Sequence, residues 1–359
     1  MPKTEIIKID PANIEMEKIK RAAAILKEGG LAAFPTDTVY GLGADCSNEK
    51  AVKRVYEIKK RPLSKSLPVQ IDKPERLEAF GVEIGEGVKA LMDKFWPGPL
   101  TLILKGKDGK KTGFRVPANE IARKLLEECR MPLCVPSANF SGNPASNNSS
   151  GVIISFDGLI EVIIDASFAG GGVESTVLDV TSAPYVLLRE GAIALGELNK
   201  ELRGGAEIVK AKNALFVCTG NSCRSVMAKG LFEKETAGRS YLTVSSAGTA
   251  AISGYSPTKE TIEVMREEEI DVSGEKSRHI SPSLVNKADL ILTMQARHKE
   301  YIIDAYPDAK SKVYLLKEYR DTSGRAELEV KDPIGQSIKI YKEVLKEIKT
   351  EVVRIKEFV

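Results

Sequence analysis

The stretch that decides the fold of the C-terminal half is VCTGNSCRS, residues 217–225. The apolar run ALFVC that leads into it predicts a buried strand, and RSVMAKGLF at its end predicts the start of a helix. A loop between a strand and a helix lies at the carboxyl edge of a parallel sheet, where such sheets bind ligands. Backbone N–H groups at a helix N-terminus attract anions. We therefore expect an anion-binding loop.

Cys218 and Arg224 bracket this loop and would face the same bound oxyanion. An arginine can hold two oxygens of a tetrahedral oxyanion through a bidentate contact. The positive field of such a loop lowers a thiol pKa from about 8.5 by roughly 3 units, which is about 4 kcal/mol in favour of the thiolate. Displacement by a thiolate also needs an acid that protonates the leaving group. Asp332 in KDPIGQS offers one, on a loop stiffened by Pro333.

The string CTGNSCRS, with a later Asp-Pro, resembles the active-site loop of the low-molecular-weight protein tyrosine phosphatase family over about residues 213–356. The resemblance implies that Cys218 is the nucleophile, Arg224 binds phosphate and Asp332 is the general acid. Asn221 would shape the loop, Ser225 would hydrogen-bond the thiolate, and Cys223 would pair reversibly with Cys218 on oxidation. The expected phosphate-binding residues are Thr219, Gly220, Asn221, Ser222, Cys223 and Ser225.

Two positions bear on the phosphatase substrate. Ile334 and Gly335 follow Asp332–Pro333, where tyrosine-directed members carry aromatic residues, and Ser222 is small and polar where those members are bulky and apolar. These features resemble the bacterial protein arginine phosphatase branch, and phosphoarginine and phosphotyrosine both stay open as substrates. The thioredoxin-coupled arsenate reductase branch is disfavoured because it needs two further cysteines downstream, whereas no cysteine follows Cys223.

The composition of the whole chain is that of an ordinary globular protein. Its 359 residues suggest two or three domains, and its net charge of +3 is too small for a broad basic face. We find neither an apolar signal segment nor a run of about 18 apolar residues, so no membrane residence is expected. Five scattered cysteines and two histidines favour a reducing cytoplasm over a disulfide scaffold, and no metal site built from side chains is expected.

Helical and strand-like patterns alternate along both halves, which predicts an α/β protein. The pattern lapses into charge and glycine near residues 203–212, so we expect domains at 1–205 and 213–359 with a linker at 206–212. The first domain should be a twisted open α/β sheet with a basic cavity, and the second a three-layer αβα domain with a parallel sheet. In the second, SPTKETIEVMREEEI predicts a helix capped by Ser256 with Pro257 at its first position.

Seven strings mark the N-terminal half. In order they are PTDTVYGLG, KKRP, FWPGPLTLIL, FRVPANEIA, VPSANFSG, GVEST and LLREGA. Their order and spacing resemble the threonylcarbamoyl-AMP synthase family, also called YrdC-like, over about residues 5–200. The resemblance implies that L-threonine, bicarbonate and ATP are joined into threonylcarbamoyl-AMP with release of pyrophosphate, and that Mg²⁺ accompanies the ATP. Such a reaction needs positioning and charge compensation rather than a protein nucleophile.

The resemblance also implies roles for single residues of this half. Lys59 and Arg61 form the Lys-x-Arg element, and Ser137 with Asn139 forms a Ser-x-Asn element near ATP. Thr36, Arg115 and Ser175 are expected to hold threonine, and Arg189 the nucleotide. One departure is LSKSLPVQI, where Lys65, Ser66 and Gln70 stand in a region that carries Asn-Pro-Leu and a later histidine in many members.

The leading hypothesis is a bifunctional cytoplasmic enzyme. Its first domain would supply the intermediate for threonylcarbamoyladenosine in tRNA, so the expected partners are the downstream threonylcarbamoyl transferase proteins, with tRNA contact left open. Its second domain would hydrolyse phosphorylated proteins through a cysteinyl-phosphate. The alternative is an RNA-binding YrdC-like module fused to a regulatory phosphatase, which would bind RNA without consuming ATP.

Overall fold

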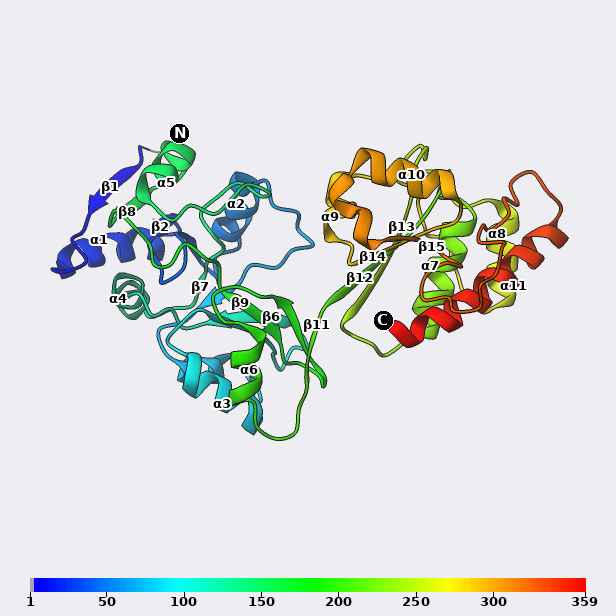
Figure 1. Cartoon of the computed structure of the whole chain (residues 1–359). Coiled ribbons are helices and arrows are strands. Elements are labelled where there is room, and N and C mark those ends of the chain that lie inside the picture. Colours follow the sequence, from blue (N-terminus) through cyan, green and yellow to red (C-terminus); the bar gives the residue numbers. More distant parts are fainter. Residues whose placement is uncertain (1–2) are drawn as a thin grey trace. The chain divides into compact units, whose positions relative to one another are not determined.

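The protein is described here by a computed structural model of residues 3–359. Its contacts divide the chain into two compact units, one that ends at Lys210 and one from Ala211 to Val359. The predicted α/β class is confirmed in both (Figure 1). No helix within residues 3–359 is long and apolar enough to cross a membrane.

The first unit is built on one mixed sheet of 11 strands. It contains both parallel and antiparallel pairs, as where β2 pairs parallel with β8 and antiparallel with β3. In spatial order the strands are β1 (Glu5–Lys8), β8 (Val162–Asp165), β2 (Ala32–Phe34), β3 (Gly41–Asp45), β7 (Leu133–Cys134), β4 (Val69–Gln70), β6 (Lys111–Arg115), β5 (Leu100–Lys105), β9 (Thr176–Asp179), β10 (Tyr185–Arg189) and β11 (Ile208–Lys210).

Helices cover this sheet and bury its apolar side chains in two clusters. In one cluster Ile19 and Leu125 pack near Phe34, and in the other Leu91 packs near Leu100. Each such fully buried side chain contributes about 1.5–3 kcal/mol. The helices are α1 (Met16–Lys27), α2 (Glu49–Lys59), α3 (Glu86–Phe95), α4 (Glu120–Cys129), α5 (Ser149–Phe156), α6 (Leu195–Glu201) and the 3₁₀-helix η1 (Pro74–Phe80).

The segment 206–212, expected as a linker, includes a strand. β11 pairs parallel with β10, and Ile208 is buried in the core of the first unit. Lys212 already belongs to the first strand of the second unit. Sequence reasoning treated the charge and glycine of this segment as loop character, but three residues suffice to extend a sheet at its edge.

The second unit is the expected three-layer domain. Its four strands are all parallel, in the order β13 (Leu242–Gly248), β12 (Lys212–Cys218), β14 (Leu290–Thr293) and β15 (Val313–Leu315). The two faces of the sheet lie against separate apolar clusters, one including Leu231 and Leu345 and the other Val285 and Ile302. The helices are α7 (Arg224–Glu235), α8 (Lys259–Glu267), α9 (Pro282–Lys287), α10 (Ala296–Ala305), α11 (Ile338–Ile355), and the 3₁₀-helices η2 (Pro307–Lys312) and η3 (Lys356–Phe358).

The expected start of α8 is wrong by two residues. The cap is Thr258 rather than Ser256, because the Thr258 side chain accepts a hydrogen bond from the N–H of Thr261. Thr258 N–H itself donates to the carbonyl of Ser222, 3.1 Å away. Pro257 therefore precedes the helix, and the true cap is fixed by a contact with the cysteine loop that the local sequence does not reveal.

Candidate active sites

The cysteine loop joins β12 to α7, as expected, and Asn221 fixes its shape. Asn221 has φ of 52°, a left-handed conformation that asparagine tolerates better than most residues. Its side chain is 1% exposed and donates to Ser225 Oγ at 3.0 Å and Ser246 Oγ at 2.9 Å. Its Oδ1 accepts from the N–H of Arg278 at 2.9 Å. The loop is thus held by buried hydrogen bonds rather than by its own turn alone.

Cys218 ends β12 with its thiol at the floor of this loop. Its Sγ lies 3.0 Å from Ser225 Oγ, and the residue is 3% exposed. Because Ser225 Oγ already accepts from Asn221, its own proton is free to point at the sulfur. Ser225 is therefore placed to donate a hydrogen bond to the Cys218 sulfur.

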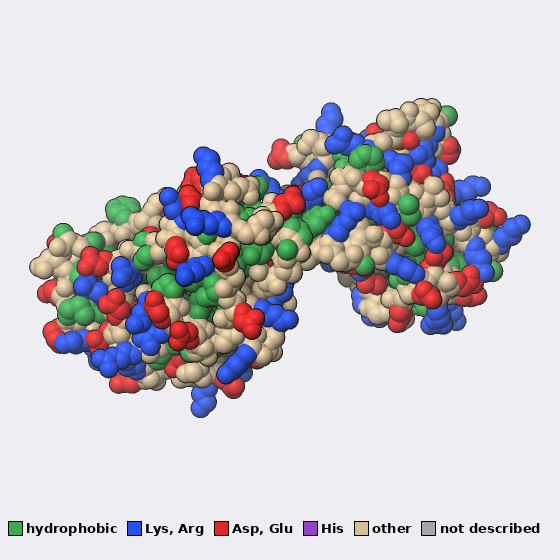
Figure 2. All heavy atoms as spheres, turned by 90° about the horizontal axis from the view of Figure 1, so that it is seen from below, with side chains coloured by type: hydrophobic (Ala, Val, Ile, Leu, Met, Phe, Trp, Pro, Cys, Tyr) green, Lys and Arg blue, Asp and Glu red, His purple; other side chains and the backbone are tan. Residues whose placement is uncertain are grey.

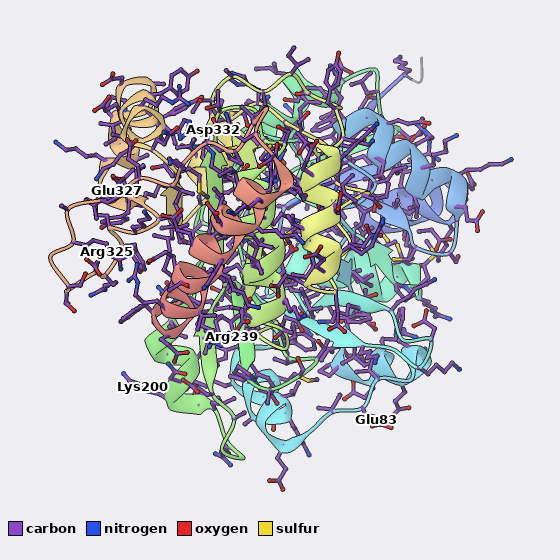
Figure 3. The ribbon with its side chains drawn as sticks, turned by 90° about the vertical axis from the view of Figure 1, so that its right-hand side faces the viewer. Glu83, Lys200, Arg239, Arg325, Glu327 and Asp332 are labelled. Carbon is purple, nitrogen blue, oxygen red and sulfur yellow. The ribbon has the colours of Figure 1, made fainter. Side chains whose placement is uncertain are left out.

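Arg224 and Asp332 meet across the mouth of the loop. The Arg224 guanidinium is buried, donates to Gln295 Oε1 and to the Val330 carbonyl at 2.9 Å each, and forms an ion pair with Asp332. Its Nε has no partner within residues 3–359, so a donor is left for a ligand oxygen. Asp332 lies on the segment that leads into α11 (Figure 3).

Three residues around this site carried no sequence signal. Gln295, Arg297 and His298 lie at the start of α10, and each contacts the loop or its arginine. They belong to no recognisable motif, and only the parallel pairing of β12 with β14 brings them beside Cys218.

The positions that bear on substrate choice line the rim. Ile334 is 56% exposed, and Ser222 Oγ lies 3.6 Å from Cys223 Sγ. Cys223 is a free thiol, 4% exposed, whose sulfur lies 3.5 Å from the hydroxyl of Tyr341 on α11.

The first unit contains a cavity of about 170 Å³. That is smaller than the roughly 300–1,000 Å³ of sites for drug-sized ligands, and it suits a small polar molecule. Six residues predicted from the sequence line it, from β6, β10 and four loops: Thr36, Arg61, Arg115, Ser137, Ser175 and Arg189.

The cavity wall is positively charged and pre-organised. Arg115 is 5% exposed and donates to the Gly98 carbonyl at 3.0 Å and to Thr38 Oγ1 at 2.9 Å, while Asp37 pairs with it at 2.6 Å. Burial lowers the pKa of Arg115 from its ordinary value. Arg189 donates to Ser175 Oγ at 3.1 Å. Arg189 also pairs with Glu174, a further lining residue, at 2.7 Å, so each of these two arginines is held by a carboxylate while Arg61 adds a third positive charge to the wall.

Lys59 and Asn139 do not line the cavity, although they lie directly behind it. Lys59 is 1% exposed, and its Nζ donates to the carbonyls of Ser137 and Asn139, the latter at 2.5 Å, and lies 3.3 Å from Asn139 Oδ1. Burial, and then the nearby Arg61, lowers the pKa of Lys59 to about 8. The three contacts of the Lys59 ammonium group all go to Ser137 and Asn139. Lys59 therefore supports the Ser-x-Asn element.

Gln70 is a cavity residue to which sequence reasoning assigned no role. It is 4% exposed, lines the cavity from β4 beside Arg115 of β6, and its Oε1 has no partner within residues 3–359. The only sequence signal for Gln70 was that LSKSLPVQI departs from the Asn-Pro-Leu and later histidine that many family members carry in this region. This acceptor is therefore free to accept a hydrogen bond from a ligand or from water in the cavity.

Neither unit offers a dedicated metal site among the residues described. No group of three His, Cys, Asp or Glu side chains within residues 3–359 is close enough to hold an ion. On the face shown in Figure 2, lysine and arginine side chains are interspersed with aspartate and glutamate rather than gathered into one basic patch.

Comparisons with known proteins divide at the same place as the structure. Residues 24–191 match the Sua5/YciO/YrdC family model, described as telomere recombination, and residues 213–358 match the model of low molecular weight phosphotyrosine protein phosphatases. The chain is 46% identical over 196 residues to threonylcarbamoyl-AMP synthase of Pyrococcus abyssi, covering 52% of this chain and 58% of that protein. It is 32% identical over 206 residues to a putative threonylcarbamoyl-AMP synthase of Methanocaldococcus jannaschii, covering 55% of this chain and 97% of that protein. The chain thus spans little more than half the length of the first curated relatives it matches.

Solved structures align with the whole chain or with one of its halves. Pyrococcus abyssi Sua5 complexed with L-threonine aligns over 98% of both chains at 28% identity, with a TM-score of 0.54. YwlE arginine phosphatase from Geobacillus stearothermophilus aligns at 32% identity over 41% of this chain and 91% of its own, with a TM-score of 0.38.

Proposed function

Because the chain belongs to the Sua5/YciO/YrdC family in its first unit and to the low-molecular-weight phosphatase family in its second, we propose a bifunctional enzyme. The first unit makes threonylcarbamoyl-AMP from L-threonine, bicarbonate and ATP, and the product is consumed by transferases that modify tRNA. The second unit hydrolyses phosphorylated proteins through a cysteinyl-phosphate.

The observation that carries the synthase proposal is the cavity of about 170 Å³ on which six sequence-predicted residues converge. Its size suits threonine with a carbonate-derived group and leaves the nucleotide outside, over the Ser137–Asn139 element that Lys59 holds. Arg115, with Thr36 and Ser175 on the same cavity wall, binds threonine, and its positive charge favours the unprotonated amine.

The chemistry then requires no protein nucleophile. The threonine amine attacks the carbon of bicarbonate, a C–O bond breaks, and water leaves to give a carbamate. A carbamate oxygen then attacks the α-phosphorus of ATP, and the bond from this phosphorus to the bridging oxygen breaks as pyrophosphate leaves. Arg61 and Arg189, both on the cavity wall, offset the charge that develops on the phosphoryl oxygens. Mg²⁺ enters as part of the MgATP substrate, because this ion is usually held by substrate phosphates rather than by an all-protein cage.

In the phosphatase, the thiolate of Cys218 attacks phosphorus while the loop N–H groups and Arg224 Nε bind the phosphoryl oxygens. Without substrate, Arg224 is paired with Asp332. A bound phosphoryl group competes for Arg224, and Asp332 acts as the general acid that protonates the leaving group. Water then hydrolyses the cysteinyl-phosphate with Asp332 as base.

We propose phosphoarginine as the preferred phosphatase substrate. Neither the exposed Ile334 nor the small Ser222 supplies an aromatic side chain to pack against a phenyl ring, whereas a guanidinium can donate to the Ser222 hydroxyl oxygen. A hydrogen bond to a charged group is worth roughly 1.5–3 kcal/mol, or about 10- to 150-fold in rate if it is made in the transition state.

The test of both assignments is one set of assays on the full chain. Pyrophosphate release should require threonine, bicarbonate and ATP together, and kcat/KM should be higher for phosphoarginine than for phosphotyrosine. Tight binding of RNA with no threonine-dependent pyrophosphate release would instead support an RNA-binding module. A tenfold preference for phosphotyrosine would return the second unit to the tyrosine-directed branch.

A further inference from the structure

His298 makes a buried contact with the cysteine loop that the phosphatase mechanism does not use. It lies on the first turn of α10, is 1% exposed, and its Nε2 is 2.8 Å from the hydroxyl oxygen of Thr219. Thr219 is the residue directly after Cys218 in the loop.

The neighbours of Thr219 limit which groups can accept the proton of its hydroxyl. Arg297 donates to Thr219 Oγ1 at 3.2 Å, and a guanidinium can only donate. No other acceptor for the Thr219 hydroxyl proton lies within hydrogen-bonding distance in the described part of the chain. The hydroxyl is thus placed to donate to His298 Nε2 in the tautomer that carries its proton on Nδ1, and Nδ1 is buried with no partner within residues 3–359.

The surrounding charges keep this ring neutral. Burial, followed by the positive charges of Arg224 and Arg297, lowers the pKa of His298 to about 4, while Asp332 and Glu329 act in the opposite direction. At neutral pH the imidazole is thus uncharged, so one of its two ring nitrogens can accept a hydrogen bond.

Thr219 is held through both its main chain and its side chain. The carbonyl of Thr219 accepts from the N–H of Ala250 at 3.0 Å, so the main chain of this residue is held by the segment after β13. Its side chain is held by α10 through His298. Because the carbonyl and the side chain of Thr219 are both held, the peptide N–H groups next to Cys218 are kept in one orientation toward a bound phosphoryl group.

We propose that His298 is a positioning residue of the phosphatase: its neutral imidazole accepts the hydroxyl of Thr219 and so holds the loop beside Cys218 in the conformation that binds phosphate. This inference rests on the proposed phosphatase function and assigns a residue outside the family's loop motif. It concerns the pre-organisation of the cradle and not the chemical step itself.

A double-mutant cycle in the full chain tests it, with p-nitrophenyl phosphate as substrate and inorganic phosphate as inhibitor. We expect His298→Leu and Thr219→Val each to lower kcat/KM about tenfold and to weaken phosphate inhibition by a similar factor, since each removes one buried hydrogen bond. The double variant should be no worse than either single variant, because the two side chains act as one unit. His298→Gln, whose amide oxygen can accept at the position of Nε2, should recover most of the loss.

Controls separate this role from simple destabilisation. Pyrophosphate release by the first unit should be unchanged in every variant, and replacing the other histidine (His279→Gln) should leave phosphate inhibition unchanged. Additive losses in the double variant, or wild-type phosphate inhibition in His298→Leu, would overturn the inference while leaving the phosphatase assignment intact. If His298→Leu does not fold, the double variant Thr219→Val/His298→Gln is compared with the single variant Thr219→Val. The two should have the same kcat/KM and the same phosphate inhibition, because the partner of residue 298 is absent from both. A wild-type chain without hydrolase activity would instead refute the proposed function itself.

Discussion

Replacing Lys59 with methionine should weaken the first unit and its hold on ATP together. Methionine keeps the apolar stem in place, so the change removes the ammonium without opening a large cavity. What is lost is the set of contacts from Nζ to the carbonyls of Ser137 and Asn139 and to the Asn139 side chain.

The magnitude follows from opposing terms. Two hydrogen bonds from a charged donor contribute about 3–6 kcal/mol. Burial of the charge opposes this gain. The pKa of Lys59 is lowered from 10.5 to about 8, which corresponds to about 3 kcal/mol that disfavours the charged form in the folded state. The variant also leaves the part-buried carbonyls of Ser137 and Asn139 without this donor, at about 1 kcal/mol each. The hydrogen bonds and the unpaired carbonyls together outweigh the burial of the charge, and we expect Lys59→Met to reduce the free energy of unfolding by about 2–5 kcal/mol.

The chain offers a clean assay for this change. Its single tryptophan, Trp96, is buried in the first unit and donates from Nε1 to the Leu100 carbonyl at 2.7 Å. Urea unfolding followed by tryptophan fluorescence therefore reports on the first unit alone, while hydrolysis of p-nitrophenyl phosphate reports on the second. The matched control is Lys53→Met on the same helix, where the side chain is 77% exposed.

The same variant should raise the KM for ATP at least tenfold, because the Ser137–Asn139 element loses its support, with a smaller effect on the KM for threonine. A Lys59→Met chain with the unfolding midpoint of the Lys53→Met control and a wild-type KM for ATP would refute this reasoning. Loss of pyrophosphate release with unchanged stability would indicate that Lys59 contacts the nucleotide directly.

Four further predictions concern single residues. Asp332→Asn should slow phenyl phosphate hydrolysis at least 100-fold more than p-nitrophenyl phosphate hydrolysis, and equal slowing would contradict its role as general acid. Ser222→Ile should shift the kcat/KM ratio toward phosphotyrosine about tenfold, and an unchanged ratio would exclude Ser222 from substrate choice. Gln70→Leu should raise the KM for threonine about tenfold without changing that for ATP, because it removes an acceptor that faces the cavity; equal KM changes would argue against it. Because the folded pKa of His298 is about 4 against an ordinary 6.5, its contribution to stability is complete above pH 6.5 and falls as the pH drops toward 4, by at most about 3 kcal/mol, and His298→Leu should flatten this part of a stability curve measured by circular dichroism.

The sequence was most informative where structure is local. The strand into Cys218 and the helix from Arg224 follow from apolar runs that flank a glycine-containing loop, and β12 and α7 lie where these runs predict them. The residues that line the cavity of the first unit could be predicted for a different reason. Whole strings in a fixed order resemble a family even where no single residue is distinctive.

What the sequence could not predict depends on contacts between distant segments. The two-residue β4 owes its existence to pairing with β6 on one side and β7 on the other. Gln70 and His298 carry no motif, and they matter only because folding buries one against a cavity and the other against the cysteine loop. Thr258 caps α8 rather than Ser256 because the same residue also contacts the loop at Ser222.

The central claim is that one chain carries two active enzymes, and the Cys218→Ser variant tests it most directly. Serine keeps the loop but removes the phosphatase nucleophile, so the full-length variant isolates the synthase in the presence of an intact second unit. The account predicts pyrophosphate release at the wild-type rate that requires threonine, bicarbonate and ATP together, with no detectable hydrolysis of p-nitrophenyl phosphate. Pyrophosphate release that is absent or independent of threonine, or undiminished hydrolysis of p-nitrophenyl phosphate, would contradict it.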